Sequence, residues 1–159
     1  MTDDTPSRIL VPTDFSEQSN HALRYAASLG ERFGAELHLL HVLTLHGLEP
    51  PGEAFPDLDG LLAAADRAAR RHLDAGALHR GAAAASVVTR VERSVNAWDA
   101  ILEYARHESV DLVVMAMHSG SKVARFLLGS NTERVLRLAP CPILVVEKGD
   151  RDFLDPETM

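Results

Sequence analysis

Residues 110–117 read VDLVVMAM, and this run decides the fold. From Leu112 to Met117 every side chain is apolar, so a strand formed here is apolar on both of its faces. Strands of that kind lie in the middle of parallel sheets, where helices cover both sides. The run therefore predicts a central strand in a layered α/β domain.

Further apolar runs alternate with segments of helical period along the rest of the chain, which is the rhythm of βαβ units. We expect the other strands at residues 8–12, 36–43, 84–91 and 142–147. We expect helices at residues 15–34, 57–80, 96–108 and 131–138, with a proline-rich loop at residues 44–56. Asn96 and Asp99 have the chemistry of a capping pair for the third of these helices.

Right-handed crossovers between parallel strands place helices on both faces of a sheet. The pattern therefore predicts a three-layer α/β/α sandwich around a five-stranded parallel sheet. If the chain winds one way from the first strand and back through the fourth, the strand order is 3-2-1-4-5. Ligands in such sheets bind beyond the carboxyl ends of the strands, where the winding direction reverses.

The composition limits the possible functions. The chain has 159 residues, of which 46% are hydrophobic, so we expect one domain with a substantial core. No run approaches the roughly 18 to 20 apolar residues of a membrane span, and the N-terminus lacks the pattern of a secretion signal, so we expect a cytoplasmic protein without a membrane partner. A net charge of -7 disfavours nucleic acid as a partner. The single cysteine, Cys141, is interpreted as a small buried hydrophobe.

The candidate ligand site lies where the first and fourth strands end. Asp14 follows the first strand, and residues 115–130 follow the fourth. Ser130 and Glu133 are spaced as a capping box, which needs no ligand. The same helix start, preceded by Gly129, also offers free backbone amides and a partial positive charge to a phosphate. Both interpretations stay open from the residues alone.

Three stretches resemble the universal stress protein family. They are RILVPTDFSEQSNHALRYAASL at residues 8–29, LHLLHVL at residues 37–43, and RVLRLAPCPILVV at residues 134–146. The resemblance runs from residue 8 to residue 147 and implies a Rossmann-like fold of the adenine nucleotide alpha hydrolase type. It implies a single universal stress protein domain over residues 1–148, followed by an acidic tail, residues 149–159, that we expect to be mobile.

Family members that bind ATP carry Gly-x2-Gly-x9-Gly-Ser/Thr after the fourth strand. In this chain Ala116 and Ser119 replace the first two glycines, whereas Gly129 and Ser130 keep the last pair. Lys122 and Arg125, between them, could face phosphate oxygens or be solvated. The resemblance implies a nucleotide site built from Pro12, Thr13, Asp14, Val42, Met115, Ala116, Ser119, Gly129, Ser130 and Asn131.

Two of these residues also have simpler interpretations. Asp14 would accept hydrogen bonds from ribose hydroxyls, but it also suits a turn that enters a helix at Ser16. Val42 would pack on the adenine, but it also suits the core of a strand.

The function expected from the resemblance is regulatory. The chain would bind ATP or a related adenine nucleotide, with Mg²⁺ accompanying the phosphates, as a stress-response module. The alternatives are a stress protein that binds no nucleotide and acts through its dimer surface, and a slow ATP hydrolase. No nucleophile and base pair is recognisable, and so we name no catalytic residue.

The last strand predicts the partner. In the order 3-2-1-4-5, residues 142–147 (PILVVE) form an edge strand whose apolar row needs a cover. A second copy pairing antiparallel about a two-fold axis would provide it, and the resemblance implies this homodimer. A metal site is not expected, because His38 and His41 point to opposite faces of their strand and no other histidines share metal-ligand spacing.

Overall fold

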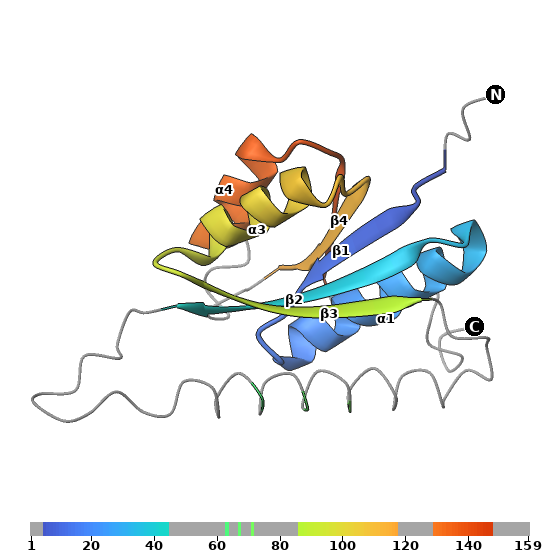
Figure 1. The fold of residues 1–159 in the computed structure, drawn as a ribbon, viewed down its shortest axis with the longest axis horizontal. Coiled ribbons are helices and arrows are strands. Elements are labelled where there is room, and N and C mark those ends of the chain that lie inside the picture. The colour runs from blue at the N-terminus through green and yellow to red at the C-terminus, as the bar shows by residue number, and fades with distance from the viewer. Residues whose placement is uncertain are drawn as a thin grey trace, which may run out of the picture.

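The computed structural model describes residues 5–44, 63, 67, 71, 86–117 and 129–147. The described residues form one sheet of five parallel strands in the order β3-β2-β1-β4-β5 (Figure 1). The strands are β1 (Arg8–Pro12), β2 (Glu36–Thr44), β3 (Val87–Ser94), β4 (Leu112–Ala116) and β5 (Ile143–Val146). The predicted strand order is confirmed, and β3 begins three residues later than the sequence indicated.

Helices lie on both faces of this sheet, as Figure 1 shows. α1 (Glu17–Phe33) packs on one face, and α3 (Ala97–His107) with α4 (Ser130–Leu138) packs on the other. The expected helix at residues 57–80 lies outside the described residues, apart from three exposed helical positions: Ala63, Arg67 and Arg71. The three-layer architecture is therefore present in the described part of the chain. No helix in this part is long and apolar enough to cross a membrane.

The core is divided in two by the sheet. Neighbouring residues of β4 belong to different halves: Val114 packs in the cluster under α1, whereas Val113 packs in the cluster under α3 and α4. Both side chains are 0% exposed, which confirms that this strand is covered on both faces. Complete burial of one such side chain contributes about 1.5 to 3 kcal/mol to stability.

Two predicted helix caps are wrong. α4 begins at Ser130 with Gly129 as its N-cap, so Ser130 lies inside the first turn and caps nothing. The Glu133 carboxylate does not reach back, because it accepts a hydrogen bond from the Arg137 guanidinium one turn later, at 2.9 Å. At the start of α3, the Asn96 side chain makes no capping hydrogen bond. Helical spacing located both helices, but local side-chain partners decided how they begin.

The amino end of the sheet is closed by one carboxylate. Asp111, just before β4, accepts hydrogen bonds from the Ser7 amide at 2.8 Å, the Ser7 hydroxyl at 2.7 Å and the Arg8 amide at 2.9 Å. Partial burial raises the pKa of Asp111, but the hydrogen bonds from Ser7 and Arg8 outweigh it and hold that pKa below its ordinary value. The carboxylate therefore ties β4 to the start of β1.

A buried polar chain joins β2 to α3. His38 is 3% exposed, and its two ring nitrogens lie 2.9 Å from the Tyr104 hydroxyl and 2.8 Å from the Glu36 carboxylate. Because a carboxylate only accepts, Nε2 carries a hydrogen and donates it to Glu36, and Nδ1 and the Tyr104 hydroxyl share the other hydrogen bond. Hydrogen bonds from His38 and Ser86 lower the pKa of Glu36, and burial raises the pKa of Tyr104. Each ring nitrogen of His38 and each carboxylate oxygen of Glu36 therefore has a hydrogen-bond partner in this network.

Candidate functional site

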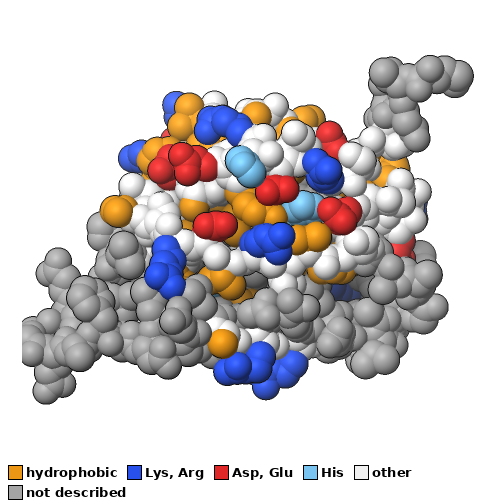
Figure 2. Space-filling model, viewed as in Figure 1, with side chains coloured by type: hydrophobic (Ala, Val, Ile, Leu, Met, Phe, Trp, Pro, Cys, Tyr) orange, Lys and Arg blue, Asp and Glu red, His pale blue; other side chains and the backbone are white. Residues whose placement is uncertain are grey.

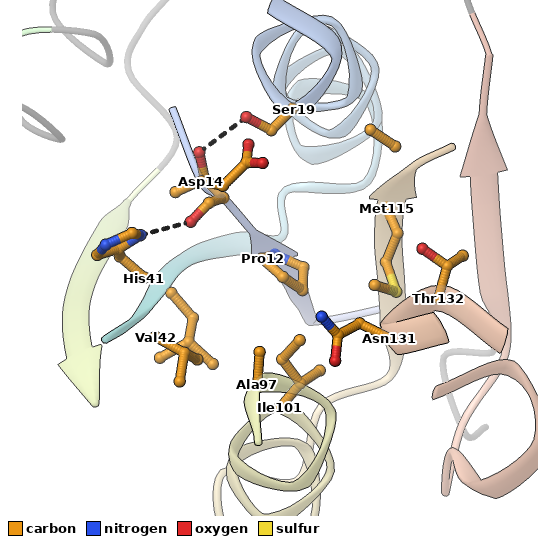
Figure 3. A pocket seen from close by; sticks show the side chains of 13 residues that line it. Pro12, Asp14, Ser19, His41, Val42, Ala97, Ile101, Met115, Asn131 and Thr132 are labelled. Carbon is orange, nitrogen blue, oxygen red and sulfur yellow. Dashed lines mark hydrogen bonds between the residues drawn. The ribbon is translucent and has the colours of Figure 1, made fainter. Parts of the chain in front are cut away.

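A cavity of about 140 Å³ opens at the carboxyl ends of β1 and β4, between the first turns of α3 and α4 (Figure 3). This is the place expected from the reversal of winding in the strand order. The residues that line it come from all the described helices and from three of the strands or the turns after them. They are Pro12, Thr13, Asp14, Ser19, Leu40, His41, Val42, Ala97, Ile101, Met115, Ala116, Asn131 and Thr132.

The turn between β1 and α1 forms one wall of the cavity. The Thr13 amide donates to the Leu40 carbonyl at 2.8 Å, which extends the pairing of β1 with β2 by one step. Asp14 follows, and its carboxylate accepts from the Ser16 amide at 2.9 Å. The Ser16 hydroxyl then accepts from the Ser19 amide and caps α1. Asp14 therefore organises the helix entry and also lines the cavity, so the two interpretations of this residue are compatible.

The same turn is held from β2 by His41. Its Nδ1 lies 2.7 Å from the Thr13 carbonyl oxygen, so this nitrogen carries the proton and donates. The His41 ring also contacts Phe15, with ring centroids 4.6 Å apart. His41 therefore serves the turn after β1, whereas His38 serves the network on the opposite face of the sheet.

The start of α4 forms the opposite wall. The first backbone hydrogen bond of this helix runs from the Glu133 amide to the Gly129 carbonyl at 2.9 Å. The amides of Ser130, Asn131 and Thr132 precede that bond and have no partner within the helix. They carry the partial positive charge of the helix N-terminus. This wall can hold an anion.

Thr132 adds a polar side chain to that wall. The residue is only 4% exposed, and it lines the cavity. Figure 3 shows the Thr132 oxygen on the side of Met115 and the cavity. A ligand oxygen beside it could accept a hydrogen bond from this hydroxyl.

The remaining walls are mostly apolar. Val42 extends from the end of β2, Met115 from β4, and Ile101 from the second turn of α3, and all three side chains point toward the cavity in Figure 3. Pro12 lies between them at the end of β1. The cavity therefore offers an apolar surface between a carboxylate on one wall and a helix N-terminus on the other.

The structure brings together seven of the ten predicted site residues, because Pro12, Thr13, Asp14, Val42, Met115, Ala116 and Asn131 all line the cavity. Gly129 and Ser130 begin α4 but are not among the lining residues. Ser119, Lys122 and Arg125 lie outside the described residues. Ala116 ends β4 and is not among the residues with a positive φ, so its methyl group adds no backbone strain.

Sequence reasoning missed six residues of the lining: Ser19, Leu40, His41, Ala97, Ile101 and Thr132. Two of them, Ala97 and Ile101, lie on the helix that follows β3, and the carboxyl end of β3 lies on the same edge of the sheet as that of β1. The strand order therefore indicated that the start of this helix would lie near the cavity. Thr132 gave no such indication, because a threonine inside an apolar helix pattern resembles any other first-turn residue.

A second hollow lies between β3 and α3 and has a volume of about 700 Å³. Its lining mixes both signs of charge: Arg90, Glu92, Glu103, Arg106, His107 and Glu108, with Tyr104 among them. Figure 2 shows positive and negative side chains interleaved over this face. A surface that binds duplex nucleic acid gathers positive charge instead, so this face does not have that character. Among the described residues no group of three His, Cys, Asp or Glu side chains could hold a metal ion.

Comparison with known proteins gives a family. The model described as Universal stress protein family matches residues 6–147. A universal stress protein of Methanocaldococcus jannaschii is 30% identical over 148 residues, covering 91% of this chain and 84% of that protein. The solved structure of the universal stress protein UspA from Lactobacillus plantarum matches with a TM-score of 0.69 at 27% identity, covering 88% of this chain and 97% of that one.

Two further solved structures share the fold and contain nucleotides. One is the universal stress protein from Archaeoglobus fulgidus in complex with dAMP, with a TM-score of 0.62, 20% identity, and coverage of 87% of this chain and 95% of that one. The other is a universal stress protein in complex with cAMP, with a TM-score of 0.62, 21% identity, and coverage of 91% and 99%. At these identities the likeness establishes the fold, and the ligands belong to those proteins.

Proposed function

Because the chain belongs to the universal stress protein family, we propose that it binds an adenine nucleotide in the cavity between β1 and β4. The nucleotide would be ATP or a related molecule, with Mg²⁺ accompanying the phosphates. Its occupancy would change which conformation or partner the protein favours, as in a regulatory module. The two relatives of the same fold that hold dAMP and cAMP support this class of ligand.

The observation that carries the proposal is the anion-binding wall at the start of α4. The amides of Asn131 and Thr132, which have no partner within the helix, and the Thr132 hydroxyl lie beside one cavity. A phosphate accepts hydrogen bonds from both kinds of donor and is attracted by the helix N-terminus. The residues at the start of α4 therefore fit the phosphate of the implied nucleotide. Ala116, in place of the family's glycine, is still part of the regular strand β4.

The other walls fit a nucleoside. Val42, Ile101 and Met115 offer an apolar surface for a flat base, and the Asp14 carboxylate can accept from ribose hydroxyls at the opposite end. A base, a sugar and a phosphate present apolar, donor and acceptor surfaces. The cavity offers a complement to each of them: the apolar side chains, the Asp14 carboxylate and the amino end of α4.

Calorimetric titration of the purified protein with Mg-ATP, and separately with AMP, tests the proposal. We expect a dissociation constant on the order of micromolar for at least one of them. Asp14→Asn keeps an oxygen for the Ser16 amide but removes the negative charge, so α1 should still form while affinity falls. Gly129→Val crowds the start of α4 and should also lower affinity. No heat from the wild type with either nucleotide would favour the family members that bind none.

We also propose the homodimer through β5. Among the described strands, β5 pairs only with β4, and Leu144 on it is 37% exposed. Leu136 and Leu138 at the end of α4 are also exposed, by 39% and 52%. An antiparallel second copy of β5 would cover this edge. Val145→Arg should then give monomers or insoluble protein, and a Val145→Arg variant that light scattering finds dimeric would exclude this interface.

A further inference from the structure

The turn that carries Asp14 into the cavity is not held by its own residues alone. β1 ends at Pro12, whereas β2 runs four residues beyond the paired Leu40 and ends at Thr44. The first residue of that overhang is His41, whose Nδ1 donates to the Thr13 carbonyl at 2.7 Å. Figure 3 shows this hydrogen bond crossing directly to the residue before Asp14. The imidazole therefore fixes one end of the peptide that bears the carboxylate.

The other end of that peptide is strained. Phe15 has a φ of 63°, in the left-handed region that costs a residue with a side chain about 1 to 2 kcal/mol. The Thr13 hydroxyl accepts from the Phe15 amide at 3.0 Å, and the His41 ring lies against the Phe15 ring. His41 thus contacts the residues on both sides of Asp14. Strain of this kind persists only where surrounding contacts over-determine the conformation.

We propose that His41 is a positioning residue for the Asp14 carboxylate, and that ligand affinity at this site depends on it. This inference rests on the proposed nucleotide function and deepens it. The imidazole holds the Thr13 carbonyl with its Nδ1 hydrogen and holds Phe15 with its ring face. Without both contacts the turn relaxes toward an unstrained backbone, and the carboxylate leaves the place where a ribose would meet it.

A double-mutant cycle separates positioning from general support of the fold. The same titrations with Mg-ATP and AMP are made on the wild type, His41→Ala, Asp14→Asn and the double variant. If His41 acts through Asp14, His41→Ala weakens affinity about tenfold in the wild type but less than about twofold in the Asp14→Asn background. Equal losses in both backgrounds, or no loss in either, would overturn the inference.

Two variants serve as controls. His41→Asn places an amide nitrogen where Nδ1 lies, so it should restore part of the lost affinity, which simple loss of volume would not allow. His38→Gln disturbs the other histidine of the same strand, which bonds to Tyr104 on the opposite face. It should lower thermal stability and leave the affinity of the remaining folded protein within about twofold of the wild type.

A readout without ligand keeps this inference separate from the proposed function. The Ser16 amide donates to Asp14, so its hydrogen exchange reports where the carboxylate lies. We expect exchange at Ser16 to quicken about tenfold in His41→Ala and to stay unchanged in His38→Gln. NMR of the imidazole nitrogens should find His41 protonated at Nδ1. If the wild type binds no nucleotide, the proposed function fails, but the positioning role is overturned only if these two signals are absent.

Discussion

Asp111 and Asp14 are aspartates at opposite ends of the sheet, and they are used differently. Asp111 precedes β4 at the amino end, where its carboxylate takes three hydrogen bonds from Ser7 and Arg8 and links two strands. Asp14 follows β1 at the carboxyl end, where its carboxylate accepts from the Ser16 amide and lines a cavity. The first carboxylate serves the fold, whereas the second organises a helix entry and also faces the candidate site.

Other polar side chains of the two ends differ in a similar way. In the network toward the amino end, Glu36, His38 and Tyr104 satisfy one another. At the carboxyl end, Thr132 is nearly as buried as His38, but it lies at the cavity wall rather than within a network of this kind.

The largest expected effect comes from breaking the satisfied network. His38→Ala leaves a cavity and also leaves the Tyr104 hydroxyl and Glu36 without their partner. We expect the free energy of unfolding to fall by about 2 to 4 kcal/mol. Chemical denaturation measures this, and His41→Ala is the matched comparison on the same strand. If His38→Ala lowered the free energy of unfolding less than His41→Ala does, the network at the amino end would not be the more important one for stability.

Thr132 should show the opposite balance. Thr132→Val keeps the shape of the side chain and removes the hydroxyl beside the cavity. Nucleotide affinity should then fall about tenfold, while the free protein unfolds at the same temperature or slightly higher. Calorimetric titration and thermal unfolding of one preparation give both numbers. A clear drop in unfolding temperature would show that this hydroxyl supports the fold after all.

A smaller loss is expected from the amino-end carboxylate. Asp111→Ala removes three hydrogen bonds, but the group is exposed, so water replaces part of what is lost. We expect unfolding to become easier by about 1 kcal/mol. Nucleotide affinity should not change, because the site lies at the other end of the strands. Weakened binding in this variant would indicate that the two ends are coupled.

The smallest effect is a pH dependence. The pKa values of Asp111 and Glu36 are lowered in the folded protein from ordinary values of 3.8 and 4.5. A lowered folded pKa contributes stability above the ordinary pKa, and that contribution is lost as pH falls through the folded pKa. The unfolding temperature should therefore drop as pH falls below about 4.5, and the drop should be shallower in Asp111→Asn. Parallel pH curves for the two proteins would contradict this.

The fold could be predicted from the sequence because its signals are periodic. Apolar runs and helical stripes gave the strands, the layers and the strand order, and each depends on burial of whole faces rather than on single contacts. The helix caps failed for the converse reason. Whether Glu133 turns back to Ser130 or forward to Arg137 depends on competing hydrogen bonds of similar strength, which spacing does not rank.

The cavity lining was anticipated near the strand ends and missed where it depends on helix rotation. The family resemblance implied Asp14, Val42 and Met115, and these residues lie near or just beyond the carboxyl ends of strands along one edge of the sheet. Ile101 and Thr132 enter the cavity because of how α3 and α4 rotate and pack against each other. Ile101 is only 4% exposed, so the side of α3 that packs on the sheet also reaches the cavity.

Trp98 has a consequence for anyone who studies this protein in solution. It is the single tryptophan of the chain, and it follows Ala97 of the cavity wall. Its ring lies 5.0 Å from the guanidinium carbon of Arg134, so one indole bridges α3 and α4. Ultraviolet emission from the unlabelled protein thus comes from one tryptophan beside the cavity, and any movement of the two helices apart would register as a change in its colour or brightness.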